Sequence, residues 1–259
     1  MNQDLVEYSF GDARRGVLST TRRTTMSTPL GVIVGAFEEL EKLLNCGSNS
    51  ELRLDTFCDA SSLVSVLFSS LGLAFKFAEL EYVSKVKNLV QASKTYETLH
   101  EILDRDIANG NVKTSGSNSR NLRRVRQGLD LIRALFEQFL ATKYAQPLDD
   151  YLLLLFAAII KHVKCSMIYK CAYHDSDYSL KEAASTAYTQ VCAPYHSWTV
   201  RTAVYAGMCT LPSRDQLLLR LNETDKSAEK KMKRYIDASV PVIQYIDKLY
   251  ISRNINLDW

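Results

Sequence analysis

An apolar stripe with the spacing of an α-helix runs through residues 119–138, SRNLRRVRQGLDLIRALFEQ. On a helical wheel, one face carries Leu122, Val125, Leu129, Ile132 and Phe136. Such a stripe is typical of a helix that packs on a protein core. Only 10 Gly and 5 Pro occur among the 259 residues, so few positions can end a helix. The sequence therefore predicts an all-α fold built from long helices.

The same spacing predicts helices along most of the remaining chain. Ser119 is the expected N-cap of the arginine-containing helix, because its hydroxyl can accept a hydrogen bond from one of the first helical N–H groups. Gly72 is the expected weak point of the longest apolar stretch. Besides 119–138, the expected helices cover residues 28–44, 54–93, 95–108, 180–193, 195–210, 213–221 and 224–251.

Composition and charge are those of an ordinary folded protein. Apolar residues make up 46% of the chain and charged residues 24%. The net charge of +3 is too small to favour general nucleic-acid binding, so any positive field is local. The six cysteines form no CxxC motif and no secretory signal begins the chain, which predicts reduced thiols in a cytosolic protein.

Residues 1–27 are expected to form a flexible arm ahead of one domain that spans residues 28–259. The arm contains the basic, hydroxyl-rich stretch ARRGVLSTTRRTTMST, which leaves an organelle transit peptide as an alternative. Asp4, Glu7 and Asp12 count against that alternative, because transit peptides are poor in acidic residues.

The face of the arginine helix opposite the core stripe changes character along its length. Arg120 and Arg124 lie one turn apart on this face, and the next residues on the same line are Leu131 and Leu135. A solvated face would stay polar along its whole length. Taken alone, the two arginines are also compatible with such a face.

Two further stretches have the same design, with a polar end and an apolar or small remainder. In residues 54–93 the line runs through Leu63, Leu67, Ala74 and Phe77 to Glu81 and Lys85. In residues 195–210 it runs from His196 through Val200 and Ala203 to Gly207. Separately, these patterns also fit a surface ion pair and a structural histidine. Together, the three lines indicate a pocket for an amphiphile with an anionic head.

Physical chemistry explains why a lipid would need such a pocket. Exposing hydrocarbon to water costs about 0.8 kcal/mol per methylene, so a two-chain lipid leaves a bilayer very slowly unless a protein encloses its chains. The buried phosphate in turn needs charge-assisted hydrogen bonds from arginine or lysine. The candidate residues around the chains are Leu67, Phe77, Leu131, Leu135, Val200 and Ala203.

Four segments carry a family resemblance: SLVSVLFSSLGLAFKFAELEYVSKVKNLVQAS, SRNLRRVRQGLDLIRALFEQ, AYTQVCAPYHSWTVRTAVYAGMCTLPSR and the terminal LDW. The chain resembles the glycolipid transfer protein family over about 28–142 and 178–259, and is most similar to its plant accelerated-cell-death branch, which handles ceramide-1-phosphate. This resemblance implies a two-layer all-α sandwich of about eight helices that opens to take a sphingolipid between its layers.

The resemblance also implies a role for each polar candidate. Lys85, Arg120 and Arg124 correspond to the family's phosphate-binding residues, and His196 to the histidine that donates to the lipid amide carbonyl. Glu81 stands where the family has an aspartate that accepts from the amide N–H and hydroxyl. Sugar-binding members carry a tryptophan at the position of Arg124, so the arginine favours a phosphate head group over a sugar.

An insertion at about 144–177 departs from the family, which has a short connection there. Its apolar run is too short to span a membrane and predicts an extra helix. The insertion is either a tolerated surface excursion or a segment that covers the lipid entrance or impairs folding. Its residues His162, Cys165, Cys171 and His174 admit a zinc site, but their central gap is shorter than in common zinc fingers, and we expect no metal.

The sequence therefore predicts a non-enzymatic carrier or sensor of a phosphorylated sphingolipid, with ceramide-1-phosphate as the favoured ligand and no cofactor. We expect a cytosolic monomer that contacts membrane surfaces transiently and does not bind nucleic acid. The alternatives are a family member whose insertion impairs lipid binding, an arginine-rich nucleic-acid-binding protein and an enzyme that acts on sphingolipids. No catalytic residue is expected, because GxSxG, HExxH, P-loop and Rossmann motifs are all missing from the sequence.

Overall fold

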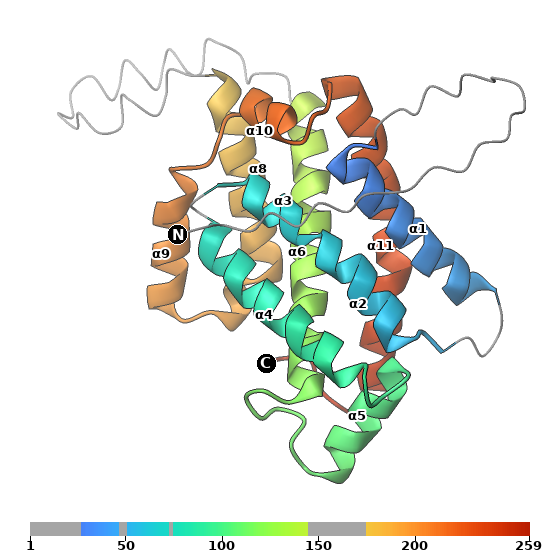
Figure 1. Ribbon diagram of the computed structural model, residues 1–259. Coiled ribbons are helices and arrows are strands. Elements are labelled where there is room, and N and C mark those ends of the chain that lie inside the picture. The colour runs from blue at the N-terminus through green and yellow to red at the C-terminus, as the bar shows by residue number, and fades with distance from the viewer. Residues whose placement is uncertain (1–26, 47–50, 73–74, 145–174) are drawn as a thin grey trace, which may run out of the picture.

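The computed structural model describes residues 27–46, 51–72, 75–144 and 175–259, and the regular elements within these ranges are all helices (Figure 1). The all-α prediction is therefore confirmed. The α-helices are α1 (Pro29–Asn45), α2 (Leu54–Leu63), α3 (Ser65–Ser70), α4 (Lys76–Ala92), α5 (Leu99–Ala108), α6 (Asn118–Tyr144), α8 (Asp175–Val191), α9 (Trp198–Met208), α10 (Arg214–Arg220) and α11 (Asp225–Ile251). A short 3₁₀-helix, Ala193–Tyr195, connects α8 to the turn before α9.

The helices form two layers with α6 at the centre. In one layer, α6 packs between α8 and α11 (Figure 1). In the other layer, α4 crosses the face of α6 diagonally and packs against α2 and α3. Helix α1 lies beside α11. Helix α5 lies at one end, near the start of α6. The central position of α6 means that most of its sides meet protein.

The apolar stripe of α6 is buried as predicted. Leu122, Val125, Leu129 and Ile132 have no exposed surface, and Phe136 is nearly buried. The ring of Tyr235, from α11, packs edge-on against Phe136 with the ring centroids 5.4 Å apart. Burying a large apolar side chain contributes about 1.5–3 kcal/mol, so this stripe fixes which face of α6 points into the core.

The stretch 54–93 is three helices rather than one, which corrects the expectation from the sequence. Helix α3 ends at Ser70, and Gly72 then adopts a left-handed backbone with φ +82°, a conformation that glycine reaches without a steric penalty. Arg220 Nη1 donates to the carbonyl oxygen of Ser70 at 2.9 Å and so provides a hydrogen-bond donor for the last carbonyl group of α3. Because of this break, Leu67 and Phe77 do not lie on one continuous helical line.

Several predicted helix starts are also wrong by a few residues, and the helices expected from 180 and 195 begin at Asp175 and Trp198. The cap of α6 is Ser117, whose hydroxyl accepts from the backbone N–H of Arg120 at 3.1 Å, whereas the N–H of Ser119 donates to Asp106 Oδ2 at 2.7 Å. Helix α5 begins at Leu99 and not at 95, because Thr98 supplies the capping hydroxyl. Several residues with a hydroxyl group precede each helix, and the sequence alone does not show which of them is the N-cap.

Several predictions concern residues that the structure does not describe. These are the arm, nearly all of the insertion and the possible zinc ligands between 162 and 174. The division into an arm, one domain and an insertion therefore stays a prediction. Within the described ranges, no helix is long and apolar enough to cross a membrane, and no group of three or more His, Cys, Asp or Glu side chains is placed to hold a metal ion.

Gly128 of α6 lies in tight contact with the side chain of Tyr82 from α4. A Cβ atom added to Gly128 would lie 2.5 Å from Cδ2 of Tyr82. The Tyr82 ring cannot move away easily, because it is buried and its hydroxyl donates to the carbonyl oxygen of Ser61 at 2.8 Å. The two layers therefore depend on a residue without a side chain at this point.

We predict that Gly128→Ala lowers the free energy of unfolding by about 1–3 kcal/mol, because the new methyl group overpacks the contact with Tyr82. The matched control is Gly35→Ala in α1, where nothing lies within 4 Å of the added Cβ. This control should leave stability unchanged or raise it by up to about 1 kcal/mol. Urea unfolding followed by circular dichroism measures both, and equal stabilities would contradict the overpacking argument.

Candidate functional site

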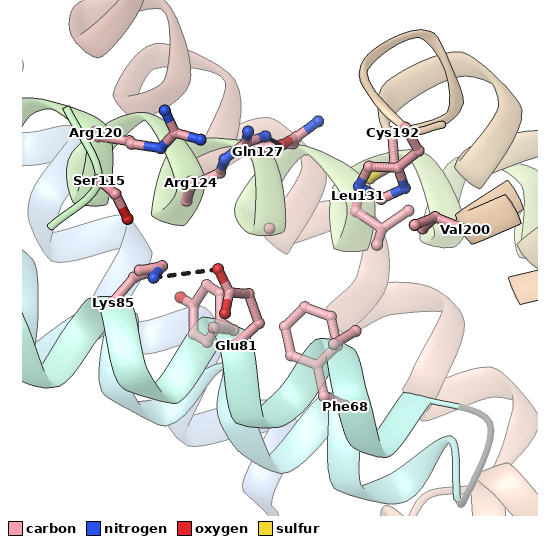
Figure 2. A pocket seen from close by; sticks show the side chains of 14 residues that line it. Phe68, Glu81, Lys85, Ser115, Arg120, Arg124, Gln127, Leu131, Cys192 and Val200 are labelled. Carbon is pink, nitrogen blue, oxygen red and sulfur yellow. Dashed lines mark hydrogen bonds and ion pairs between the residues drawn. The ribbon is translucent and has the colours of Figure 1, made fainter. Parts of the chain in front are cut away.

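A cavity of about 400 Å³ lies where α4 faces α6 (Figure 2). All five predicted head-group residues line it, and they come from α4, α6 and the turn before α9. The complete lining consists of Phe68, Ala78, Glu81, Tyr82, Lys85, Ser115, Arg120, Arg124, Gln127, Gly128, Leu131, Cys192, His196 and Val200. The structure thus brings together side chains that are more than a hundred positions apart in the sequence.

Helix α4 contributes one cation and one anion to this cavity. Lys85 Nζ lies 3.2 Å from Glu81 Oε1, one turn earlier on the same helix (Figure 2). The Lys85 side chain is only 20% exposed, whereas that of Glu81 is 64% exposed. A pair four residues apart on one helix, with its carboxylate exposed, contributes only about 0.3–0.5 kcal/mol, so either group can leave its partner for a ligand at little cost.

Helix α6 contributes two arginines that are held in place by neutral groups. Arg120 Nη1 donates to the carbonyl oxygen of Lys113 at 2.7 Å, and Arg124 Nη1 donates to Gln127 Oε1 at 2.9 Å. Among the described residues, no carboxylate lies within ion-pair distance of either guanidinium. Both arginines are therefore positioned but not neutralised.

The surroundings of Arg124 are unfavourable to its own charge. Burial lowers the pKa of its guanidinium, and the neighbouring charges of Arg120 and Arg123 lower it further, while the carboxylate of Glu81 raises it by less than these effects lower it. Arg120 also lies in the first turn of α6, where the partial positive charge of the helix N-terminus disfavours cations. An anion in the cavity would relieve the repulsion among these cations.

The other arginines of α6 have different partners. Arg126 forms a two-pronged ion pair with Asp247 of α11 and also contacts Asp130. Arg123 is buried, and its guanidinium lies over the ring of Tyr195 with 5.2 Å between Cζ and the ring centroid. The positive stretch in the sequence is thus divided into cavity residues and residues that hold the fold together.

The sequence predicted that His196 lies on the helix expected at 195–210. In the structure it lies just before α9. Its backbone is extended, and the next residue, Ser197, caps α9. The Nδ1 atom lies 2.8 Å from the hydroxyl of Tyr188. Burial lowers the pKa of His196, and the positive charge of Arg124 lowers it further, so both effects favour the neutral ring.

The apolar predictions divide into two groups. Leu131 and Val200 line the cavity. Leu67 and Leu135 are buried in the core, while Phe77 is 85% exposed and Ala203 is exposed. These four are not among the residues that line this cavity, and their role toward a lipid chain stays a prediction.

Sequence reasoning missed several lining residues. Gln127 is buried; it accepts from Arg124 and donates to the carbonyl oxygen of Val191 at 3.1 Å, so it ties Arg124 to the end of α8. Ser115 comes from the loop before α6, and the thiol of Cys192 has its pKa raised to about 12 by burial. Of these three residues, Gln127 carried a signal, since it stands one turn after Arg124.

Comparison with known proteins places this geometry in a family. A family model described as "Glycolipid transfer protein (GLTP)" matches residues 52–223. The chain belongs to the glycolipid transfer protein family. The "ACD11 homolog protein" of Arabidopsis thaliana is 58% identical over 244 residues, which cover 92% of this chain and 92% of that relative. "Accelerated cell death 11" of the same plant is 39% identical over 231 residues, covering 89% of this chain and 96% of that relative.

A solved structure agrees with these relatives. A crystal structure of a mutant of Arabidopsis ACD11 complexed with C12 ceramide-1-phosphate matches with a TM-score of 0.75 and 38% identity, and it covers 90% of this chain and 100% of that chain. The predicted two-layer helical fold and the resemblance to the plant accelerated-cell-death branch of the glycolipid transfer protein family are thus confirmed.

We predict that Arg124→Gln leaves the thermal midpoint unchanged or raises it, because the substitution removes a half-buried charge that is repelled by Arg120 and Arg123. Residues that serve a ligand are often unfavourable for stability. The matched variant Arg126→Gln should lower the free energy of unfolding by about 2 kcal/mol or more, since it leaves the carboxylate of Asp247 unpaired and removes one of the two arginines that contact Asp130. Calorimetry of the ligand-free proteins measures the difference, and a large loss for Arg124→Gln would refute this division of roles.

Proposed function

We propose that this protein binds a phosphorylated sphingolipid, with ceramide-1-phosphate as the favoured ligand, and carries it between membranes without changing it chemically. The observation that carries this proposal is the pair Arg120 and Arg124, which share one cavity with Lys85 and have no carboxylate partner of their own among the described residues. The ceramide-1-phosphate complex of the related Arabidopsis protein supports the choice of ligand.

The charges of the cavity match a phosphate monoester. Lys85, Arg120 and Arg124 supply three positive charges, and Glu81 supplies one negative charge. A phosphate monoester carries about −1.5 to −2 charges at pH 7, which nearly neutralises the remainder. The guanidinium groups can form two parallel hydrogen bonds to phosphate oxygens, while lysine provides a point charge.

The lipid amide is assigned to the remaining polar residues. His196 would donate to the amide carbonyl, and Glu81 would accept from the amide N–H and the sphingoid hydroxyl. Glu81 has one methylene more than the aspartate of the family, but its side chain is mostly exposed, and within the described part of the chain its ion pair is with Lys85. When Lys85 turns to the phosphate, the carboxylate is released for the amide.

The hydrocarbon chains require more room than the cavity offers. The cavity has an apolar wall of Phe68, Leu131 and Val200, but the interior beyond it is filled by core side chains such as Leu67 and Leu135. We therefore propose that α4 and its neighbours move away from α6 as the chains enter. Enclosing each methylene recovers about 0.8 kcal/mol, which opposes the cost of separating the two layers.

The contacts of the arginines argue against the nucleic-acid alternative. A duplex- or strand-binding helix presents its cations on one open face, whereas Arg126 is paired with Asp247 and Arg123 is buried. Covalent catalysis would need an activated nucleophile, and the thiol in the cavity, Cys192, has a raised pKa that keeps it protonated. Transient membrane contact, a monomeric state and a location in the cytosol belong to the same proposal.

Transfer between vesicles tests the proposal. Donor vesicles contain fluorescent ceramide-1-phosphate or fluorescent glucosylceramide, and acceptor vesicles contain neither. We predict that Lys85→Ala and Arg124→Gln each reduce ceramide-1-phosphate binding about 10- to 100-fold, because each removes a charge-assisted contact worth about 1.5–3 kcal/mol. The control Lys87→Ala removes an exposed lysine of the same helix and should bind and transfer as the natural protein does.

Other outcomes separate the alternatives. Equal transfer of glucosylceramide would overturn the phosphate assignment. If the folded protein transfers neither lipid, native mass spectrometry after expression in a sphingolipid-containing host decides whether the insertion blocks binding. Salt-sensitive binding of RNA that ceramide-1-phosphate fails to displace would favour the nucleic-acid alternative.

A further inference from the structure

Tyr188 is a buried residue near the end of α8 whose hydroxyl lies 2.8 Å from Nδ1 of His196. Tyr188 does not line the cavity, but its partner His196 does. Its ring is packed edge-on against Tyr205 of α9, with the ring centroids 5.5 Å apart at 88°. The hydroxyl of Tyr205 is hydrogen-bonded to Thr189 Oγ1, at 2.8 Å, and takes no part in this ring contact. The hydroxyl of Tyr188 therefore has a defined position.

The direction of the Tyr188–His196 hydrogen bond follows from the protons available. A neutral imidazole carries a single N–H, on either Nδ1 or Nε2. The pKa of Tyr188 is raised to about 12 by burial, so its hydroxyl keeps its proton at neutral pH. A buried O–H needs an acceptor, and among the described residues Nδ1 of His196 is the acceptor within reach. The proton of the imidazole then belongs on Nε2.

We propose that Tyr188 is a positioning residue that holds His196 in the Nε2–H tautomer, so that the ring nitrogen left for the cavity is a hydrogen-bond donor. This inference rests on the proposed function, because the expected acceptor is the acyl carbonyl oxygen of a ceramide-type lipid. With the other tautomer, the lone pair of Nε2 would face the lone pairs of that carbonyl, and the contact would be repulsive. Tyr188 thus makes the site selective for an acceptor without touching the ligand.

The neutral tautomer also gives His196 a role that differs from the role of the cationic residues. A protonated imidazole beside Arg124 would compete for the phosphate, whereas a neutral Nε2–H serves the amide. The charged and titratable groups that act on Tyr188 and His196 are Arg124 from α6, Cys192 after α8, and Arg201 and Tyr205 from α9. Among them, no carboxylate is present to pull the proton onto Nδ1.

The test uses Tyr188→Phe, which removes only the hydroxyl, and Tyr205→Phe, which keeps the Tyr188–His196 contact. The ligands are ceramide-1-phosphate and a dialkyl-glycerol phosphate, which has two chains and a phosphate monoester but no carbonyl. We predict that Tyr188→Phe weakens ceramide-1-phosphate binding about tenfold, as expected for one lost hydrogen bond of about 1.4 kcal/mol. Binding of the dialkyl lipid should change less than twofold, and Tyr205→Phe should resemble the natural protein with both lipids.

Nitrogen NMR of the imidazole gives a readout that needs no ligand. The natural protein should show a protonated Nε2 and an unprotonated Nδ1 for His196, and Tyr188→Phe should show a mixture of the two tautomers. An unchanged tautomer in Tyr188→Phe, or equal losses for both lipids, would overturn the positioning role. If the natural protein binds ceramide-1-phosphate poorly while its spectrum shows the Nε2–H form, the proposed function fails and the tautomer assignment stands. If the dialkyl lipid does not bind measurably, the spectrum alone decides.

Discussion

The central position of α6 is the constraint on which the rest of the structure depends. This helix is covered by α8, α11 and the α4 layer, so each of its buried charged residues must find a partner or a cavity (Figure 1). Its apolar stripe fixes the rotation of the helix, and that rotation sends Arg126 to Asp247 and Arg124 to the cavity. The binding site is therefore a consequence of how the core is packed.

The cavity holds cations that are not paired with carboxylates, which lowers the local stability of the protein but leaves these cations available to a ligand. Arg120 and Arg124 are held by a backbone carbonyl and by Gln127, which fix their positions without cancelling their charge. A carboxylate in the same place would stabilise the folded protein and would also compete with the phosphate of a ligand. The carboxylate that is present, Glu81, is exposed and pairs with Lys85 on its own helix, so it can change partners when a ligand enters.

Much of the site could be predicted because short helical spacing is local information. Arg120 and Arg124 are one turn apart, and so are Glu81 and Lys85, whatever packs against them. The predictions failed where the backbone left the regular helix. Gly72 ends the line that joined Leu67 to Phe77, and the turn before α9 displaces His196 from the helix that follows it.

The sequence by itself determined the all-helical fold, the buried face of α6 and the identity of the charged residues at helical spacing, because these depend on side-chain chemistry repeated every few positions. Only the tertiary structure decided which arginines are neutralised, since Asp247 is 121 residues from Arg126 along the chain. It likewise decided that Tyr188 meets His196 across a turn. Contacts of this kind depend on how whole helices pack, and a single sequence does not encode that packing in any local pattern.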